Sequence, residues 1–186
     1  MAALKTIGPA EIQAAIERLA VAIAARHDVP ARLILLGIAN GGVALAHRLS
    51  RRLGTRAGTI DISFHRDDIG CHPIPKEFAP TQIPSDVHGA TVILVDDVLF
   101  SGRTVKAALD ELFDHGRPAK VELAVLVDRG GRRLPLAADY TGITLATTEA
   151  EKVVVTLGET RSRRDLIQVA PASAQSKIHH PQSAIT

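Results

Sequence analysis

The chain has 186 residues, the size of a single domain, and its 46% hydrophobic and 23% charged residues exclude wholesale disorder. Its 22 Lys and Arg against 20 Asp and Glu leave a net charge of +2, so overall charge does not indicate nucleic-acid binding. The single cysteine, Cys71, excludes an internal disulfide and a CxxC zinc pattern. With no apolar stretch of membrane-spanning length and no signal-peptide pattern, we expect a cytoplasmic protein without a membrane partner.

The first half of the chain predicts two helices alternating with two strands. Pro9 followed by apolar residues at helical spacing, ending near Ile23, predicts the first helix. The sequence then predicts a buried strand over 32–38, a glycine loop, a helix over 43–53 and a strand over 58–65. Residues 66–90 contain four prolines and show no clear period, which is typical of a long flexible binding loop.

The second half continues the alternation. The apolar run over 91–95 predicts the clearest buried strand, followed by a helix over 103–115 and a strand over 121–127. Short strands are expected between 139 and 169, and residues 171–186 are expected to form a polar, disordered tail. Strands that alternate with helices predict an α/β domain with a central, mostly parallel sheet flanked by helices.

The segment that indicates chemistry is VILVDDVLFSGRT, from Val92 to Thr104. A buried strand would deliver Asp96 and Asp97 to the carboxyl edge of a parallel sheet, where open α/β folds bind ligands. Ser101 and Gly102 then open a helix, whose first N–H groups form an anion site. Because carboxylates repel phosphate, the two acids should face ribose hydroxyls or hydrated Mg²⁺. Each part alone also fits an ordinary capping turn, but together they predict a sugar-phosphate site.

This segment resembles the phosphoribosyl pyrophosphate (PRPP) motif of type I phosphoribosyltransferases. The runs TIDISFHRDD, HGRPAKVELAVLVDRGGRRLP and AADYTG further resemble PyrR, the family of pyrimidine operon regulators with uracil phosphoribosyltransferase activity. The resemblance spans about residues 8–169. It implies the type I fold over residues 1–170, with a small hood near 128–145 and the flexible loop near 66–90. It also implies a homodimer or higher homo-oligomer.

The resemblance implies a role for each matching residue in the reaction of uracil with PRPP to give UMP and pyrophosphate. Asp96 and Asp97 would bind the ribose hydroxyls, and a loop would bind the 5′-phosphate. That loop comprises Val98, Leu99, Phe100, Ser101, Gly102, Arg103 and Thr104. The pyrophosphate loop would be Ala39, Asn40 and Gly41, and the wall around the base would include Asp128, Arg129 and main chain near Val153. Mg²⁺ would enter bound to PRPP, with no direct protein ligand assigned. Asp128 would contact either the base or a group bound to Mg²⁺.

The sequence departs from the family pattern at two places. The pyrophosphate loop of the family normally reads Thr-Arg-Gly, so Asn40 lacks an expected positive charge. Gly131, Ala137 and Ile143 stand where the family has polar or basic RNA contacts, which leaves Arg132 and the additional Arg133 as candidate contacts to a pyrimidine operon mRNA leader.

Two alternatives to a uracil enzyme stay open. One is a phosphoribosyltransferase for another base, and the other is a regulator that senses UMP or UTP and binds RNA with little catalysis. Arg48, Arg51 and Arg52 share one helical face and could form an RNA backbone patch, although such clusters are more often solvated faces or subunit contacts. The eight histidines show no HExxH-like spacing, so the sequence assigns them no metal site.

Overall fold

The structure, a computed structural model, describes residues 5–27, 32–63, 65, 80–161 and 163–172. Its elements in chain order are β1 (Lys5–Ile7), α1 (Pro9–Ala24), β2 (Leu33–Ile38), α2 (Gly41–Leu53), β3 (Arg56–Ile60), β4 (Thr91–Leu99), α3 (Arg103–Asp114), β5 (Lys120–Asp128), β6 (Tyr140–Thr144), β7 (Glu151–Thr156) and β8 (Leu166–Pro171). Within these described ranges no helix is long and apolar enough to cross a membrane.

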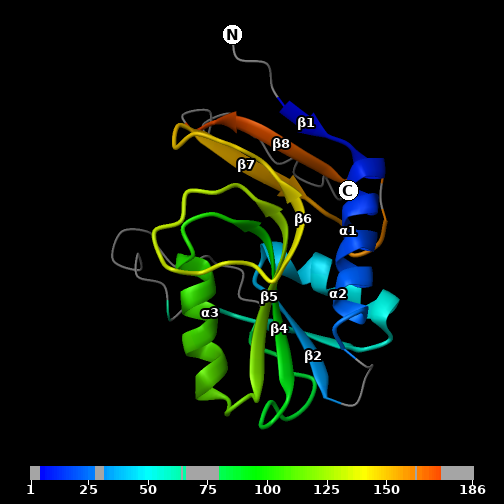
Figure 1. Cartoon of the computed structure of the whole chain (residues 1–186), viewed down its shortest axis with the longest axis vertical. Coiled ribbons are helices and arrows are strands. Elements are labelled where there is room, and N and C mark those ends of the chain that lie inside the picture. The colour runs from blue at the N-terminus through cyan, green and yellow to red at the C-terminus, as the bar shows by residue number, and fades with distance from the viewer. Residues whose placement is uncertain (1–4, 28–31, 64, 66–79, 162, 173–186) are drawn as a thin grey trace, which may run out of the picture.

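A five-stranded sheet forms the centre of the molecule, in the order β3-β2-β4-β5-β6 (Figure 1). Every neighbouring pair in it is parallel. All strands therefore end at the same edge, as the alternation of strands and helices predicted. The α/β fold class inferred from the sequence is confirmed.

Both faces of this sheet are covered, because its central strands are apolar at successive positions. Figure 1 shows α1 and α2 on one side and α3 on the other. Leu35, Ile93 and Ala124 belong to the core beneath α1 and α2, whereas their neighbours Leu36 and Leu94 belong to the core beneath α3. The alternation of side chains along each strand thus divides the core into two layers.

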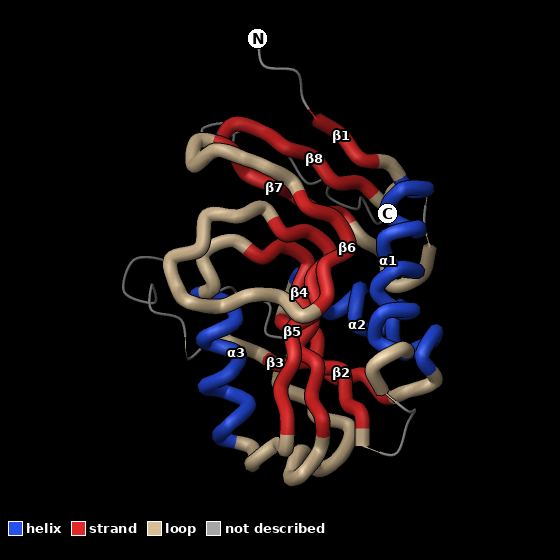
Figure 2. Tube along the Cα trace, in the orientation of Figure 1, coloured by secondary structure: helices blue, strands red, loops and turns tan. Residues whose placement is uncertain are grey.

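A second, smaller sheet lies above the carboxyl edge of the first (Figure 2). It contains β1, β8 and β7 in that order, with antiparallel pairing throughout. The segment 128–145, expected as a hood, includes the end of β5 and all of β6, which is an edge strand of the main sheet. The separate layer is instead built from the first strand and the last two strands of the described chain.

Several element bounds differ from the expected ones. β3 begins at Arg56 and ends at Ile60, earlier than the strand expected over 58–65. β4 continues through the two aspartates to Leu99 because β5 is equally long and pairs with it as far as Leu99↔Asp128. Most of the expected flexible loop and tail, 66–79 and 173–186, lies outside the described residues. Within 80–90, Gln82 forms a bridge with Thr59 of β3.

Candidate active site

Asp96 and Asp97 lie near the end of β4, at the carboxyl edge of the main sheet. Asp96 is 5% exposed and its Oδ1 accepts a hydrogen bond from the Asp97 amide at 3.0 Å. Burial, together with the negative charge of Asp97, raises the pKa of Asp96 well above its usual value. Burial also raises the pKa of the Asp97 carboxyl. Two crowded, desolvated carboxylates are best stabilised by hydroxyl donors or a cation, which is the property required of a ribose site.

The glycines at the start of α2 allow that helix to approach the acids closely. A Cβ on Gly42 would lie 1.9 Å from the Val95 carbonyl oxygen, so only glycine fits there. A Cβ on Gly41 would lie 2.5 Å from the carboxylate of Asp97. The expected pyrophosphate loop, Ala39 to Gly41, is therefore in direct contact with the acidic pair, and Asn40 is exposed beside it.

Asn40 and Gly41 share one cavity of about 310 Å³ with Asp97. It is lined by Asn40, Gly41, Ala44, Asp97, Val155, Thr156 and Leu157. The end of β7 thus faces Asp97, which the sequence alone did not reveal. Main chain near Val153 was expected beside the base. The Val153 side chain is buried in the core, and the residues that line the cavity are Val155 and Thr156 of β7 and Leu157 just after it.

The expected 5′-phosphate loop connects β4 to α3. Gly102 precedes the helix with φ of 91°, a left-handed conformation that glycine adopts without strain. The Arg103 amide donates to the Ser101 hydroxyl at 3.3 Å, and Thr104 is exposed on the first turn. The first N–H groups of a helix have no intrahelical acceptor, so this turn offers donors to an anion. Leu99 is buried, and Val98 and Phe100 are half-buried, so these three side chains present little surface to a phosphate.

Phe100 is held between two parts of the turn that follows β5. The Arg129 guanidinium lies 4.1 Å from the centre of the Phe100 ring, and a Cβ on Gly131 would lie 2.4 Å from that ring. Gly131 also has φ of 75°. A larger residue at 131 would both strain the backbone and displace Phe100, so this turn does not accept the polar or basic residue expected there.

Asp128 and Arg129, which were also expected near the base, make contacts that stabilise the fold. Arg129 is 7% exposed and donates to the Thr147 hydroxyl at 2.9 Å and the Thr148 carbonyl at 2.8 Å, so it braces the turn before β7. Asp128 accepts from the Gly130 amide at 2.9 Å and pairs with Arg132. The described contacts of Asp128 therefore stay within the turn after β5, whereas those of Arg129 connect this turn to the one before β7.

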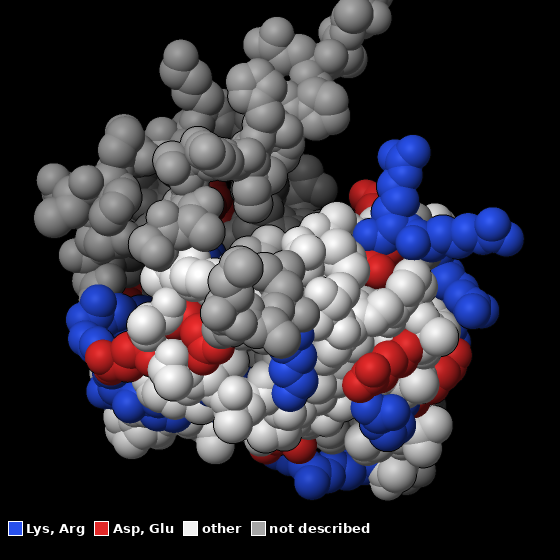
Figure 3. Space-filling model, turned by 90° about the horizontal axis from the view of Figure 1, so that it is seen from above, with Lys and Arg blue, Asp and Glu red and all other residues white. Residues whose placement is uncertain are grey.

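The expected RNA contacts differ in how accessible they are. Arg132 points inward and donates to the Phe100 and Leu136 carbonyls at 2.8 and 3.2 Å. Arg133 is 57% exposed and lies 3.3 Å from Glu149. Figure 3 shows Lys and Arg atoms interspersed with Asp and Glu atoms among the described residues of one face, rather than a patch of one sign.

The arginine patch suggested on α2 is interrupted by burial. Arg48 is 5% exposed and donates to Asp165 at 2.7 Å and to Gln13 at 2.8 Å. Arg52 pairs with Glu17 at 2.6 Å. Arg48, Arg51 and Arg52 line one cavity, as their shared helical face predicted, but Arg48 is not solvated because Asp165 returns from the far end of the chain to bury it.

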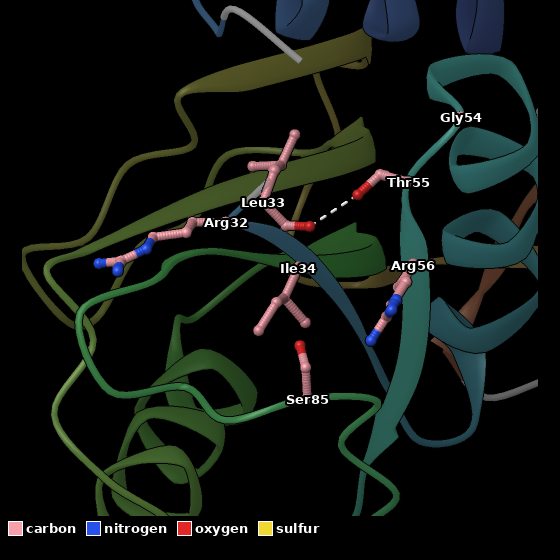
Figure 4. A pocket seen from close by; sticks show the side chains of 7 residues that line it. All are labelled: Arg32, Leu33, Ile34, Gly54, Thr55, Arg56 and Ser85. Carbon is pink, nitrogen blue, oxygen red and sulfur yellow. Dashed lines mark hydrogen bonds between the residues drawn. The ribbon is translucent and has the colours of Figure 1, made fainter. Parts of the chain in front are cut away.

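A second cavity, of about 330 Å³, lies at the opposite edge of the sheet (Figure 4). The Thr55 hydroxyl there donates to the Leu33 carbonyl at 2.6 Å. The cavity is lined by Arg32, Leu33, Ile34, Gly54, Thr55, Arg56 and Ser85. It is formed at the amino ends of β2 and β3, away from the acids and the phosphate loop, so it is not the candidate active site.

Comparison with known proteins shows which family the chain belongs to. Residues 4–159 match the family model described as "Phosphoribosyl transferase domain". Relatives named "Bifunctional protein PyrR" include one from Streptomyces coelicolor, 46% identical over 90% of this chain and 89% of its own. Another, from Corynebacterium efficiens, is 53% identical over 71% of this chain and 72% of its own.

Solved structures show the same fold at lower sequence identity. A hypoxanthine phosphoribosyltransferase from Trypanosoma cruzi is 22% identical, with a TM-score of 0.67 over 89% of this chain and 91% of its own. A hypoxanthine-guanine phosphoribosyltransferase from Bacillus anthracis is 21% identical, with a TM-score of 0.61 over 76% and 83% of the two chains. Since the family model covers most of the chain and the PyrR relatives match nearly its full length, the chain belongs to the phosphoribosyltransferase family and, within it, to the PyrR proteins.

Proposed function

We propose that this protein is a uracil phosphoribosyltransferase that converts uracil and PRPP to UMP and pyrophosphate, with a second role as an RNA-binding regulator of pyrimidine genes. One observation carries the proposal: the buried pair Asp96 and Asp97 shares an edge of the sheet with a helix-opening Ser-Gly loop and a cavity. The likeness to proteins named PyrR supports uracil as the base.

In this reaction the protein positions two substrates and stabilises developing charge. Asp96 and Asp97 accept hydrogen bonds from the ribose hydroxyls, and the N–H groups at the start of α3 donate to the 5′-phosphate. Uracil lies against the end of β7, where Val155 and Leu157 line the cavity. Holding both reactants in one place removes most of the entropic cost of their encounter, so no covalent intermediate on the protein is needed.

Mg²⁺ is the cofactor that we propose for PRPP. The donor set fits this ion, because adjacent carboxylates with raised pKa values gain from a hard cation whose own water molecules reach them. When bound, Mg²⁺ neutralises negative charge on the leaving pyrophosphate. The internal pairing of Asp128 with Arg132 makes Asp128 a weaker candidate for contact with Mg²⁺ than the acidic pair.

The test is product formation from a panel of bases. The purified protein is incubated with PRPP, Mg²⁺ and uracil, hypoxanthine or orotate, and nucleotides are separated by chromatography. We expect UMP from uracil, and loss of that product in Asp97→Asn but not in Glu11→Gln, which replaces an exposed acid on α1 outside the site. IMP or orotidylate as the main product would overturn the choice of base.

A regulator with weak catalysis is the second candidate, favoured by the exposed amide of Asn40 at the place of an expected arginine. RNA binding is tested by filter binding of a pyrimidine-leader hairpin over a salt series, with and without UMP or UTP. With Arg48 and Arg132 turned inward, we expect weak binding that falls steeply with salt. Tight, sequence-selective binding at high salt would show that another surface reads the RNA. Sedimentation of the same sample tests the proposed homo-oligomer.

A further inference from the structure

A cluster of metal-ligating side chains lies near the end of α3, outside the candidate active site. His65 follows β3, while Glu111 and Asp114 lie in the last turn of α3. One ligand atom from each of these three residues lies within 4.8 Å of the other two. Glu111 is nine positions beyond Gly102, which at the rise of an α-helix is roughly 13 Å from the phosphate loop.

The geometry of the cluster suits a cation better than a hydrogen bond. The Nε2 atom of His65 is 3.1 Å from Glu111 Oε2 and 3.4 Å from Asp114 Oδ2. A single N–H hydrogen cannot point along both directions, so the Nε2 atom of His65 can donate to only one of the two carboxylates. With metal–ligand bonds of about 2.0–2.2 Å, neighbouring donors of a tetrahedral zinc ion are separated by roughly 3.3–3.6 Å. The two measured separations are within a few tenths of an ångström of that range.

The Glu111 carboxylate is already oriented for such a role. Its Oε1 accepts from the Thr81 hydroxyl at 2.7 Å and contacts His115 Nε2 at 3.1 Å. Thr81 is fixed in turn by the Asp61 amide, which donates to its hydroxyl at 3.0 Å. These contacts fix the carboxylate through Oε1 and leave its Oε2 facing His65. Metal-binding carboxylates are commonly held by outer partners in this way.

We propose that His65, Glu111 and Asp114 bind one divalent transition-metal ion of the Zn²⁺ class, with water at the remaining coordination position. One imidazole nitrogen and two carboxylate oxygens form a donor set typical of zinc, whereas Mg²⁺ prefers oxygen ligands alone. The bound ion would link the end of α3 to the segment after β3. This site is separate from the Mg²⁺ proposed to enter with PRPP, and it does not depend on the identity of the base.

Calorimetric titration of the metal-free, full-length protein with ZnCl₂ tests the proposal. His65→Ala, Glu111→Gln and Asp114→Asn should each weaken one binding event at least about tenfold, since loss even of an outer partner typically has that effect. His88→Ala, an exposed histidine outside the cluster, should bind like the parent. MgCl₂ in place of ZnCl₂ should give no event that the three substitutions remove.

Zinc bound elsewhere is distinguishable, because the chain also contains Cys71, His72, His179 and His180. Parental zinc affinity in all three variants would overturn the proposal, even if the parent binds zinc. Loss of folding cannot mask the result, because the Asp114 side chain is 71% exposed and can be replaced without disturbing the core. X-ray absorption at the zinc edge should show nitrogen and oxygen neighbours that the three substitutions remove, and a sulfur neighbour that is lost with these substitutions would also refute the site.

Discussion

Gly41→Ala should separate catalysis from stability at the candidate active site. Gly41 is the first residue of α2 and does not have a positive φ, so alanine fits its backbone conformation. Alanine is also the better helix former, by up to about 1 kcal/mol. The nearest obstacle to the substitution is the carboxylate of Asp97, which is a flexible side chain and can move away.

The size of the effect follows from that contact. The new Cβ would lie 2.5 Å from Cγ and Oδ1 of Asp97, whereas ordinary contact begins at 3.4 Å, so the carboxylate must move about 0.9 Å (3.4 − 2.5). Misplacement of a reacting group by 1 Å can cost on the order of 100-fold in rate. We therefore expect kcat/KM for PRPP to fall roughly 100-fold, or about 2.7 kcal/mol, with the melting temperature almost unchanged.

Steady-state formation of UMP and thermal unfolding of the same samples measure the two effects. Gly8→Ala is the matched control, because no atom lies within 4 Å of the Cβ it would add. Gly42→Ala should instead lower stability, since its Cβ meets the Val95 carbonyl in the backbone at 1.9 Å. Parental kcat/KM in a folded Gly41→Ala variant would refute the view that Asp97 must occupy its present position.

Three further substitutions test the charges of the molecule. Asp96→Asn should raise the melting temperature at neutral pH, because the raised pKa of Asp96 means that its ionised form opposes folding. The same substitution should weaken UMP binding, measured by calorimetry, about 10- to 150-fold, the loss expected for a charge-assisted bond of about 1.5–3 kcal/mol. Unchanged UMP binding would contradict the ribose assignment. Glu122→Gln should make the stability of the protein depend less on pH in the acid range. Burial opposes ionisation of Glu122, but hydrogen bonds from Lys120, Tyr140 and His27 lower its pKa. The ionised carboxylate therefore stabilises the fold above the ordinary pKa of 4.5, and this stabilisation is lost as the pH falls below that value. The melting temperatures of parent and variant should converge as the pH is lowered. Parallel curves of melting temperature against pH would contradict a stabilising role of the Glu122 carboxylate. Asn40→Arg should raise turnover with uracil while UMP affinity stays the same, since UMP has no pyrophosphate; kinetics that do not improve would place Asn40 away from the leaving group.

Much of the main sheet and the acidic motif could be predicted because their signals are local. The apolar runs that became β2, β4 and β5 are buried on both faces, and such strands are recognisable from a few consecutive residues. The order of strands and helices then required parallel pairing and brought Asp96 and Asp97 to the carboxyl edge. Val92 to Thr104 carries strand, acids and helix start within 13 residues of sequence, so its site could be inferred without the fold.

Other features depend on partners that are distant in the chain. β1 has only three residues and no pattern of its own, yet it pairs with β8, where Lys5 lies opposite Val169. Arg48 has the spacing of a surface residue and is buried because Asp165 reaches it. The end of β7 lines the active-site cavity, and His65 meets Glu111, only after the chain has folded. Sequence periodicity thus determined which elements form and which face of each is buried. The tertiary structure decided which strands pair at the sheet edges and which distant residues the charged side chains contact, because these partners are far apart in the sequence.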